Sequence, residues 1–131
     1  MMVWQDHERN EWDVAIHQSL AAAEGPTAIP PGGPDPFSLA DPSAVTEILE
    51  ATGFANVAFT DVAEPVYYGP DVAAALDWAS GFASTREVLK RLDPAAAARA
   101  AGRLREKLSA HLSDDGIWLN SRAWIITAHR P

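Results

Sequence analysis

Histidines are the side chains best suited to acid–base chemistry near neutral pH, and this chain has four, at positions 7, 17, 111 and 129. His7 follows an apolar N-terminal stretch that is typical of a strand, and α/β sheets bind ligands where their strands end. There the imidazole could act as a general base on a hydroxyl or an amine. The simpler interpretation is a solvated loop histidine, and we interpret His17, His111 and His129 as surface residues. His7 is therefore a weak catalytic candidate.

Aromatic side chains are the second group with a chemical use. Those near predicted strand ends or within insertions are Trp4, Trp12, Phe37, Tyr67, Tyr68, Trp78 and Phe82. Aromatic walls are typical of a pocket for an apolar small molecule. We expect Trp4, Trp12 and Tyr67 to be the substrate-binding residues of such a pocket. The helical spacing of Trp78 and Phe82 instead predicts that they belong to the core.

Composition and charge exclude several functional classes. Ten basic and 18 acidic residues among 131 give a net charge of −8, which opposes binding to nucleic acid or to an anionic membrane surface. The chain has no cysteine, so disulfides and thiolate metal sites are excluded. The acidic residues around His7 and at Asp114-Asp115 lack a recognised metal-binding spacing, so we expect no metal site. No apolar stretch is long enough for a signal peptide or a membrane span, and we expect a cytoplasmic protein.

The best-defined elements are a helix and a strand between residues 41 and 62. Asp41 is suited to be the N-cap of the helix and Pro42 its first residue, and Gly53 is suited to end it in a left-handed conformation. Alternating apolar residues then predict a strand over 57–62, with a break at Glu64-Pro65 after which residues 66–68 could extend the strand up to Gly69-Pro70. A helix followed directly by a strand needs a sheet to pack on.

The other elements follow from apolar spacing and capping residues. We expect helices over 11–23 and 71–83, a short helix started by a capping box of Ser84 and Glu87, and a long helix from Asp93 to about Leu112. Residues 24–40 form a Pro/Gly-rich connector, and residues 70–113 form a helical insertion. The apolar run at 124–126 predicts a strand covered on both faces near the middle of the sheet. The whole chain, 1–131, is expected to be a single domain.

A set of large apolar residues is expected to be buried where the helix at 42–52 contacts the sheet. Its members are Ile48, Leu49, Phe54, Phe59, Trp124 and Ile126. Trp118 lies in the final strand and is also expected to belong to the core.

Several stretches resemble the second half of class I S-adenosylmethionine-dependent methyltransferases. Residues 46–62, TEILEATGFANVAFTDV, resemble the helix, Gly-Phe pair and sixth strand of that family, and residues 2–5, MVWQ, look like the end of its fifth strand. Residues 33–45, GPDPFSLADPSAV, are similar to the run that returns from a substrate-covering insertion. Residues 121–131, SRAWIITAHRP, look like the closing seventh strand, and the helices after residue 71 resemble the insertion of small-molecule members.

The resemblance implies a particular fold and activity. It implies an α/β fold, α+β in this fragment, with a small three-stranded mixed sheet in the order 5-7-6 covered by about five helices. The family holds its cofactor on a glycine-rich turn of the first half, and none of the eight glycines here forms a G-x-G pattern. No cofactor-binding residue carries over. We therefore expect a methyltransferase-like, truncated Rossmann-like chain that is inactive alone and binds no cofactor, although complete relatives use S-adenosylmethionine.

Two hypotheses about function and partners remain open. The chain is either the substrate-side half of a small-molecule methyltransferase that works with a separate cofactor-binding half, or a noncatalytic module that dimerises or binds a small apolar ligand. In both cases the strand at residues 1–5 has one open edge, and open apolar edges favour pairing with another chain. We expect a homodimer through this N-terminal strand.

Overall fold

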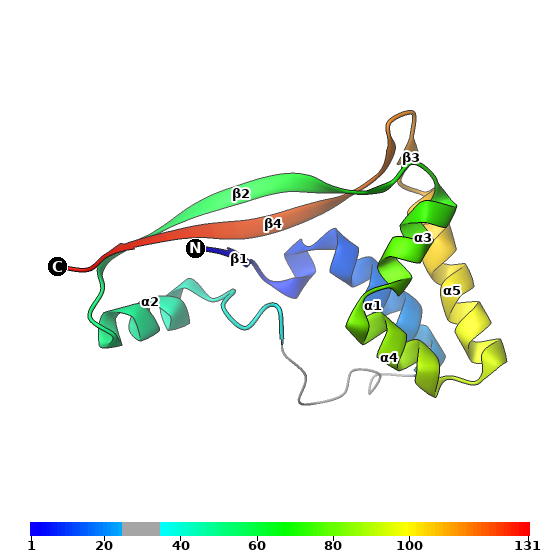
Figure 1. Ribbon diagram of the computed structural model, residues 1–131, viewed down its shortest axis with the longest axis horizontal. Helices are drawn as coiled ribbons and strands as arrows, with labels where there is room; N and C mark the ends of the chain where they lie inside the picture. Colours follow the sequence, from blue (N-terminus) through cyan, green and yellow to red (C-terminus); the bar gives the residue numbers. More distant parts are fainter. Residues whose placement is uncertain (25–34) are drawn as a thin grey trace. The chain divides into compact units, whose positions relative to one another are not determined.

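The computed structural model describes residues 1–24 and 35–131, and side chains are described for all of these except 22–24. Figure 1 shows a mixed α+β fold. In order, the elements are β1 (Met2–Trp4), the 3-10 turn η1 (His7–Arg9), α1 (Glu11–Glu24), α2 (Pro42–Ala51), β2 (Ala55–Gly69), α3 (Val72–Ser80), α4 (Ala83–Arg91), α5 (Pro94–Ser109), β3 (Leu112–Ser113) and β4 (Gly116–His129). The predicted number of about five helices is confirmed within this described part.

The sheet has the order β1-β4-β2, and the short strand β3 also pairs with β4. Strand β1 is antiparallel to β4 with Val3 opposite Trp124, and β3 is antiparallel to β4 with Leu112 opposite Ile117. The predicted order, with the last strand between the first and the middle one, is confirmed. The prediction of three strands in a mixed sheet was wrong, because β3 adds a fourth strand and the sheet is antiparallel.

The described residues divide into two compact units. The first unit contains Met1–Glu11, residues 35–64 and Asn120–Pro131, and the second contains residues 12–24 and Pro65–Leu119. Strands β2 and β4 each contribute residues to both units. The predicted connector at 24–40 lies mostly outside the described residues.

The second unit is built around an apolar core. Its buried residues come from α1, the helices α3 to α5 and the adjoining strand ends: Ile16, Leu20, Tyr68, Ala75, Ala79, Val88, Ala100, Leu104, Leu108, Ile117 and Leu119. The side chains of Asp71 and Asp93 cap α3 and α5 by accepting hydrogen bonds from the backbone N–H groups of Ala74 (2.9 Å) and Ala96 (2.8 Å). Burial every four residues along α5 gives this helix one apolar stripe facing the other helices.

The first unit contains α2, β1 and the adjoining parts of β2 and β4. Asp41 accepts a hydrogen bond from Ser43 N–H at 2.9 Å, and Pro42 is the first helical residue, as predicted. Thr52 is the C-cap and Gly53 follows with φ +87°, the left-handed conformation in which a Cβ is strained. Val45 is the fully buried residue of α2. Both ends of α2 are therefore formed by the residues predicted from the sequence.

Several predicted element boundaries were wrong, and the helix predicted over 71–83 ends at Ser80. Strand β2 continues through Glu64-Pro65, which is possible because β2 is at the edge of the sheet and Pro65 needs no partner for an N–H. Phe82, without a side-chain cap, precedes α4, so Ser84 lies inside this helix and no capping box forms. Helix α5 ends at Ser109, and Leu112 belongs to β3.

The predicted core was right in part. Ile126 is buried, Leu49, Phe54, Phe59 and Trp124 are half-buried, and Ile48 is 53% exposed because α2 has only its Val45 side in full contact. Trp78 and Trp118 are exposed, against the prediction of burial, and so is Ile125, so β4 is not covered on both faces. The long apolar run correctly predicted that β4 is the middle strand of the sheet. It did not predict which face of β4 is covered.

Candidate functional site

A hollow of about 370 Å³ in the first unit is a candidate for a small-molecule site. It is lined by Met2, Val3, Trp4, Pro36, Ser38, Leu39 and Ala123. Ser38 contributes the only side-chain hydroxyl of this lining, and the other side chains are apolar. The composition suits an apolar molecule with one hydrogen-bonding group.

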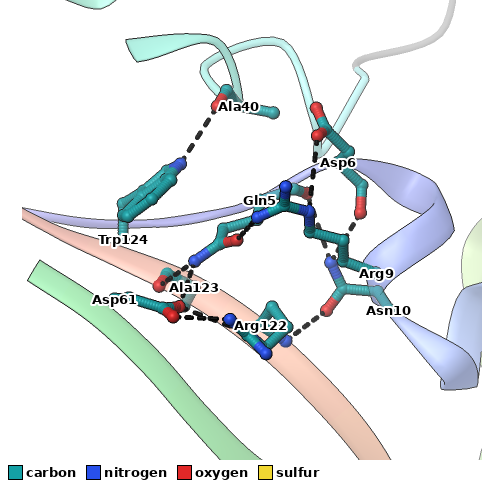
Figure 2. Close-up of polar contacts among 9 residues, drawn as sticks. All are labelled: Gln5, Asp6, Arg9, Asn10, Ala40, Asp61, Arg122, Ala123 and Trp124. Atoms are coloured by element: carbon teal, nitrogen blue, oxygen red, sulfur yellow. Dashed lines mark hydrogen bonds and ion pairs between the residues drawn. The ribbon is translucent and has the colours of Figure 1, made fainter. Parts of the chain in front are cut away.

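The loop that forms one wall of the hollow is fixed by its own hydrogen bonds. Asp35 Oδ1 accepts from Phe37 N–H at 2.9 Å, and the backbone N–H of Ala40 donates to Phe37 O at 3.0 Å. The indole N–H of Trp124, on β4, donates to the Ala40 carbonyl at 3.1 Å (Figure 2). The wall is therefore attached to the central strand.

The catalytic candidate His7 lies in η1, and its ring packs edge-on against Phe37. The ring centroids are 5.9 Å apart with an interplanar angle of 77°. Phe37 lies between two residues that line the hollow, so His7 is adjacent to its loop wall. His7 is half-buried rather than fully solvated.

A polar cluster at the end of β1 holds this part of the first unit together (Figure 2). Gln5 is 1% exposed, and its amide N–H donates to Asp61 Oδ1 at 2.6 Å and to the Ala123 carbonyl at 2.9 Å, while its Oε1 accepts from Arg9 at 2.9 Å. All polar atoms of this buried amide are thus engaged, which is the condition for burying them without a large penalty.

Asn10 is a second buried polar residue with a full set of contacts. Its side-chain amide donates to the carbonyls of Gln5 (3.2 Å) and Asp6 (3.1 Å), and its Oδ1 accepts from the backbone N–H of Arg122 at 3.0 Å. These bonds fix the η1 turn, and with it His7, between β1 and β4. We refer to Gln5, Asn10, Asp61 and Arg122 as the polar clasp.

Asp61 and Arg122 form the outer part of the polar clasp. Arg122 Nε donates to Asp61 Oδ1 at 3.1 Å and its Nη2 donates to Asp61 Oδ2, a bidentate pairing. The hydrogen bonds from Arg122, and after them that from Gln5, lower the pKa of the Asp61 carboxyl below its ordinary 3.8. Both side chains are substantially exposed, so this pair is a geometric link more than a large source of stability.

In the second unit, aromatic rings gather around Phe82. Its ring centroid is 6.2 Å from Trp12, 6.5 Å from Tyr68 and 5.9 Å from Trp78, each in an edge-to-face arrangement. Tyr67 belongs to a different aromatic pair, 5.0 Å from Trp118 between the centroids. The Phe82 cluster is the larger of the two.

An acid–base pair that was not predicted from the sequence lies on α1. His17 Nδ1 is 2.8 Å from Asp13 Oδ2, and Asp13 is buried. The hydrogen bond that the Asp13 carboxylate accepts from the imidazole raises the pKa of His17 above 6.5, against a smaller opposing effect of burial. The i, i+4 spacing of Asp13 and His17 on a predicted helix was the available signal.

The structure thus places the sequence-predicted site residues differently. Trp4 lines the hollow of the first unit, whereas Trp12 and Tyr67 lie in the second unit in two different aromatic groups. His17 and His111 are not simple surface residues, since His17 pairs with Asp13 and His111 Nδ1 is 2.8 Å from Lys107 O. His129 is exposed, as predicted.

Comparison of the chain with protein-family models, with curated protein sequences and with solved structures finds no match in any of the three. Among the described residues, no helix is long and apolar enough to cross a membrane.

Proposed function

We propose that this chain is the substrate-side part of a class I methyltransferase-like fold, in which the hollow beside Trp4 holds an apolar methyl acceptor. The observation that supports the proposal most is the sheet order β1-β4-β2, with the last strand antiparallel between the other two. The resemblance implies this arrangement for strands five, seven and six. The helices α3 to α5 lie between β2 and β4 in sequence, where small-molecule members have an insertion.

In this proposal none of the described glycines holds S-adenosylmethionine. Gly69, at the turn from β2 to α3, comes closest to the required strand-glycine-helix pattern. A Cβ at Gly69 would lie 2.9 Å from Ala74 Cβ and 3.0 Å from Ala75 N, so the space beside this glycine is filled by α3 itself. The carboxylate of S-adenosylmethionine could not approach that backbone. In the proposal, the cofactor is held by residues other than these 131.

The proposal is tested by two-dimensional NMR of the five tryptophan indole N–H signals, assigned with single Trp→Phe variants. Small aromatic alcohols and amines are titrated first, followed by S-adenosylmethionine. We expect saturable shifts of the Trp4 signal with an apolar aromatic ligand, and no saturable binding of S-adenosylmethionine at micromolar concentration. One-to-one binding of the cofactor would mean that the wrong half of the fold was assigned. If the Trp4 signal does not shift with any ligand, the hollow beside Trp4 is not the acceptor site.

A second candidate function, a dimerising module, is favoured by the open side of β1. In the described sheet β1 pairs with β4 alone, and Met1 and Met2 are 59% and 66% exposed. Met1 exchanges both backbone hydrogen bonds with Ile126, and Gln5 N–H donates to Arg122 O. Because hydrogen-bonded pairs alternate along antiparallel strands, the N–H of Met2 is directed away from β4. A second copy could pair there.

Light scattering coupled to size exclusion tests the homodimer. Met2→Pro removes the outward N–H without removing a bond to β4, and Met2→Leu is the matched control. We expect a dimer for the wild type and Met2→Leu and a monomer for Met2→Pro. A wild type that stays monomeric at tens of micromolar, or a Met2→Pro variant that stays dimeric, contradicts pairing through β1.

A further inference from the structure

Two aromatic side chains lie next to each other on the outer face of the sheet in the second unit. Tyr67 on β2 and Trp118 on β4 have 5.0 Å between their ring centroids and an interplanar angle of 52°. They are 46% and 40% exposed, whereas their neighbours along the strands, Tyr68, Ile117 and Leu119, are buried. Side chains alternate between the two faces of a strand, so this pair lies on the face opposite to the core.

The backbone beside the aromatic pair is tightly packed. A Cβ at Gly116, which has φ +98°, would lie 2.6 Å from Gly69 O and 2.9 Å from Tyr67 Cε2, so the tyrosine ring lies directly against the start of β4. The indole N–H of Trp118 donates to the Asp115 carbonyl at 3.2 Å. Both rings are therefore held in place at the surface, and little conformational entropy is lost when a ligand binds to them.

The chain around the aromatic pair carries negative charge. Asp114 and Asp115 form the turn between β3 and β4, and Asp71 caps α3 shortly after the end of β2. Residues 10–85 and 108–121, which include β2, α3 and this turn, contain no Lys or Arg. Within the described parts of the chain, neither carboxylate of the turn forms an ion pair. Their charges can therefore attract a cation from another molecule.

The spacing of the two rings decides which cation fits. With 5.0 Å between the centroids, no group fits between the rings of Tyr67 and Trp118, because a stacked group needs about 3.5 Å on each side. The pair does not enclose a quaternary ammonium, and a ligand must stack on the open face of one ring. A guanidinium is planar and can stack while its N–H groups donate to a carboxylate, whereas an ammonium is a compact, strongly hydrated charge.

We propose that Tyr67 and Trp118, together with Asp114 and Asp115, form a docking surface for an arginine side chain in a basic segment of a partner protein. The guanidinium stacks on an exposed ring and donates hydrogen bonds to a carboxylate of the turn. The net charge of −8 attracts such a segment to the chain as a whole. This surface shares no residue with the hollow beside Trp4 and does not depend on the proposed function.

The test measures fluorescence anisotropy of a fluorescein-labelled tetra-arginine peptide titrated with the purified chain. The same label on tetra-lysine and on tetra-citrulline gives two controls, because citrulline keeps the planar shape of arginine without its charge. We expect saturable binding of tetra-arginine that weakens as the ionic strength rises, and no saturable binding of tetra-citrulline. Tetra-lysine should bind about two- to fivefold more weakly, because its ammonium groups do not stack. Equal affinity for the two charged peptides, or no binding of tetra-arginine at millimolar concentration of the chain, overturns the proposal.

Variants of the rings test the stacking contact. Trp118→Thr removes the exposed indole and keeps a residue suited to a strand, and it should weaken binding of tetra-arginine about two- to fivefold. Trp78→Ala is the matched control, since Trp78 is a 57% exposed indole of the same unit on α3, and it should leave the affinity unchanged. A Trp78→Ala variant that loses as much affinity as Trp118→Thr contradicts a specific role for the aromatic pair.

Variants of the carboxylates separate the docking surface from a general effect of net charge. Asp114→Asn combined with Asp115→Ser keeps residues that favour a turn, and it should weaken binding of tetra-arginine about three- to tenfold. Glu47→Gln combined with Glu50→Gln changes the net charge by the same amount at exposed positions of α2 and should have a much smaller effect. Equal losses in the two double variants would mean that the peptide follows net charge alone, which overturns the proposal.

A measurement on the wild type locates the peptide without any variant of the surface having to fold. Two-dimensional NMR records the five tryptophan indole N–H signals during a titration with unlabelled tetra-arginine, and Trp118→Phe serves only to assign one of them. We expect the Trp118 signal to shift most and with the affinity found by anisotropy. A larger shift at Trp4 or Trp78 than at Trp118 places the peptide elsewhere and overturns the proposal.

Discussion

The two units of this chain are stabilised by different kinds of interaction. In the second unit most buried residues are apolar and lie at regular intervals on α1, α3, α4 and α5, although Asp13, Ser19 and Thr85 are buried there too. In the first unit the least exposed side chains include Gln5 and Asn10, at 1% and 0%, and each makes several hydrogen bonds. The fold of the second unit is stabilised mainly by burial of apolar surface. The fold of the first unit depends in large part on hydrogen bonds.

The difference has consequences for what a mutation does. Loss of apolar volume leaves a cavity whose energetic cost depends on how far the neighbours can relax. Loss of one partner in a buried polar group leaves the others without a hydrogen bond in a place that water cannot easily reach. The second unit should therefore be sensitive to side-chain size, and the first to the identity of a few polar atoms.

The largest effect is expected for Leu108→Ala in the second unit. Leu108 is 1% exposed, and its truncation should lower the free energy of unfolding by about 2–5 kcal/mol. Leu112→Ala is the control, since Leu112 is 52% exposed and its removal should change stability by less than about 0.5 kcal/mol. Urea unfolding followed by circular dichroism measures both. Similar losses for the two variants would mean that α5 is not the centre of this core.

Phe59→Ala addresses the apolar part of the first unit. Phe59 is half-buried, and its ring packs edge-on against Trp124 with 5.8 Å between centroids. We expect a loss of about 1–3 kcal/mol, below the ~3–5 kcal/mol typical of a fully buried phenylalanine. Ile48→Ala, at an exposed position of α2, should cost less than about 0.5 kcal/mol. A loss for Phe59→Ala as large as that for Leu108→Ala would remove the distinction between the units.

The contrast between the units also explains how much could be predicted from the sequence. Local signals were reliable: the Asp41 and Asp93 caps, the end of α2 at Gly53 and the place of β4 in the sheet order are all as predicted. These features depend on one residue and its immediate neighbours, or on a long apolar run. They need little information about tertiary contacts.

Features that depend on distant partners were missed. Nothing in the sequence indicates that Gln5 contacts Asp61 and Ala123, which are 56 and 118 residues away. The burial of Asn10, within a charged segment expected to be a loop, has the same cause. Trp78 was predicted to be buried from its helical spacing and Trp118 from its place in the final strand, whereas their exposure depends on which faces are covered.

Gln5→Ala is the corresponding test of the polar clasp. It removes the amide that joins Asp61, the Ala123 carbonyl and Arg9, and we expect a loss of about 1–2 kcal/mol with faster amide exchange in β1. The matched control is Gln18→Ala, because Gln18 is an exposed glutamine with a single bond from Lys107. If both variants unfold at the same urea concentration as the wild type, the clasp adds no stability.

The smallest effects, and the sharpest contrast, are expected in the dependence of stability on pH. The folded-state pKa of Asp61 in the first unit is lowered by Arg122 below 3.8. Its stabilising contribution is therefore present above that pH and is lost as the pH falls through the lowered value. The folded-state pKa of His17 in the second unit is raised by Asp13 above 6.5, so its contribution is present below pH 6.5 and is lost as the pH rises through the raised value. The two pairs respond to pH in opposite directions.

Two neutral variants separate these contributions. Asp61→Asn should reduce the fall in urea midpoint below about pH 4 and leave the alkaline side unchanged, whereas His17→Gln should reduce the fall above about pH 6.5 and leave the acid side unchanged. Both effects should be small because Asp61, Arg122 and His17 are partly exposed. Urea midpoints measured across this range, with His129→Gln as the control for an exposed histidine, check both. If His17→Gln changes the acid side instead, Asp13 is not the partner that sets the charge of His17 in solution.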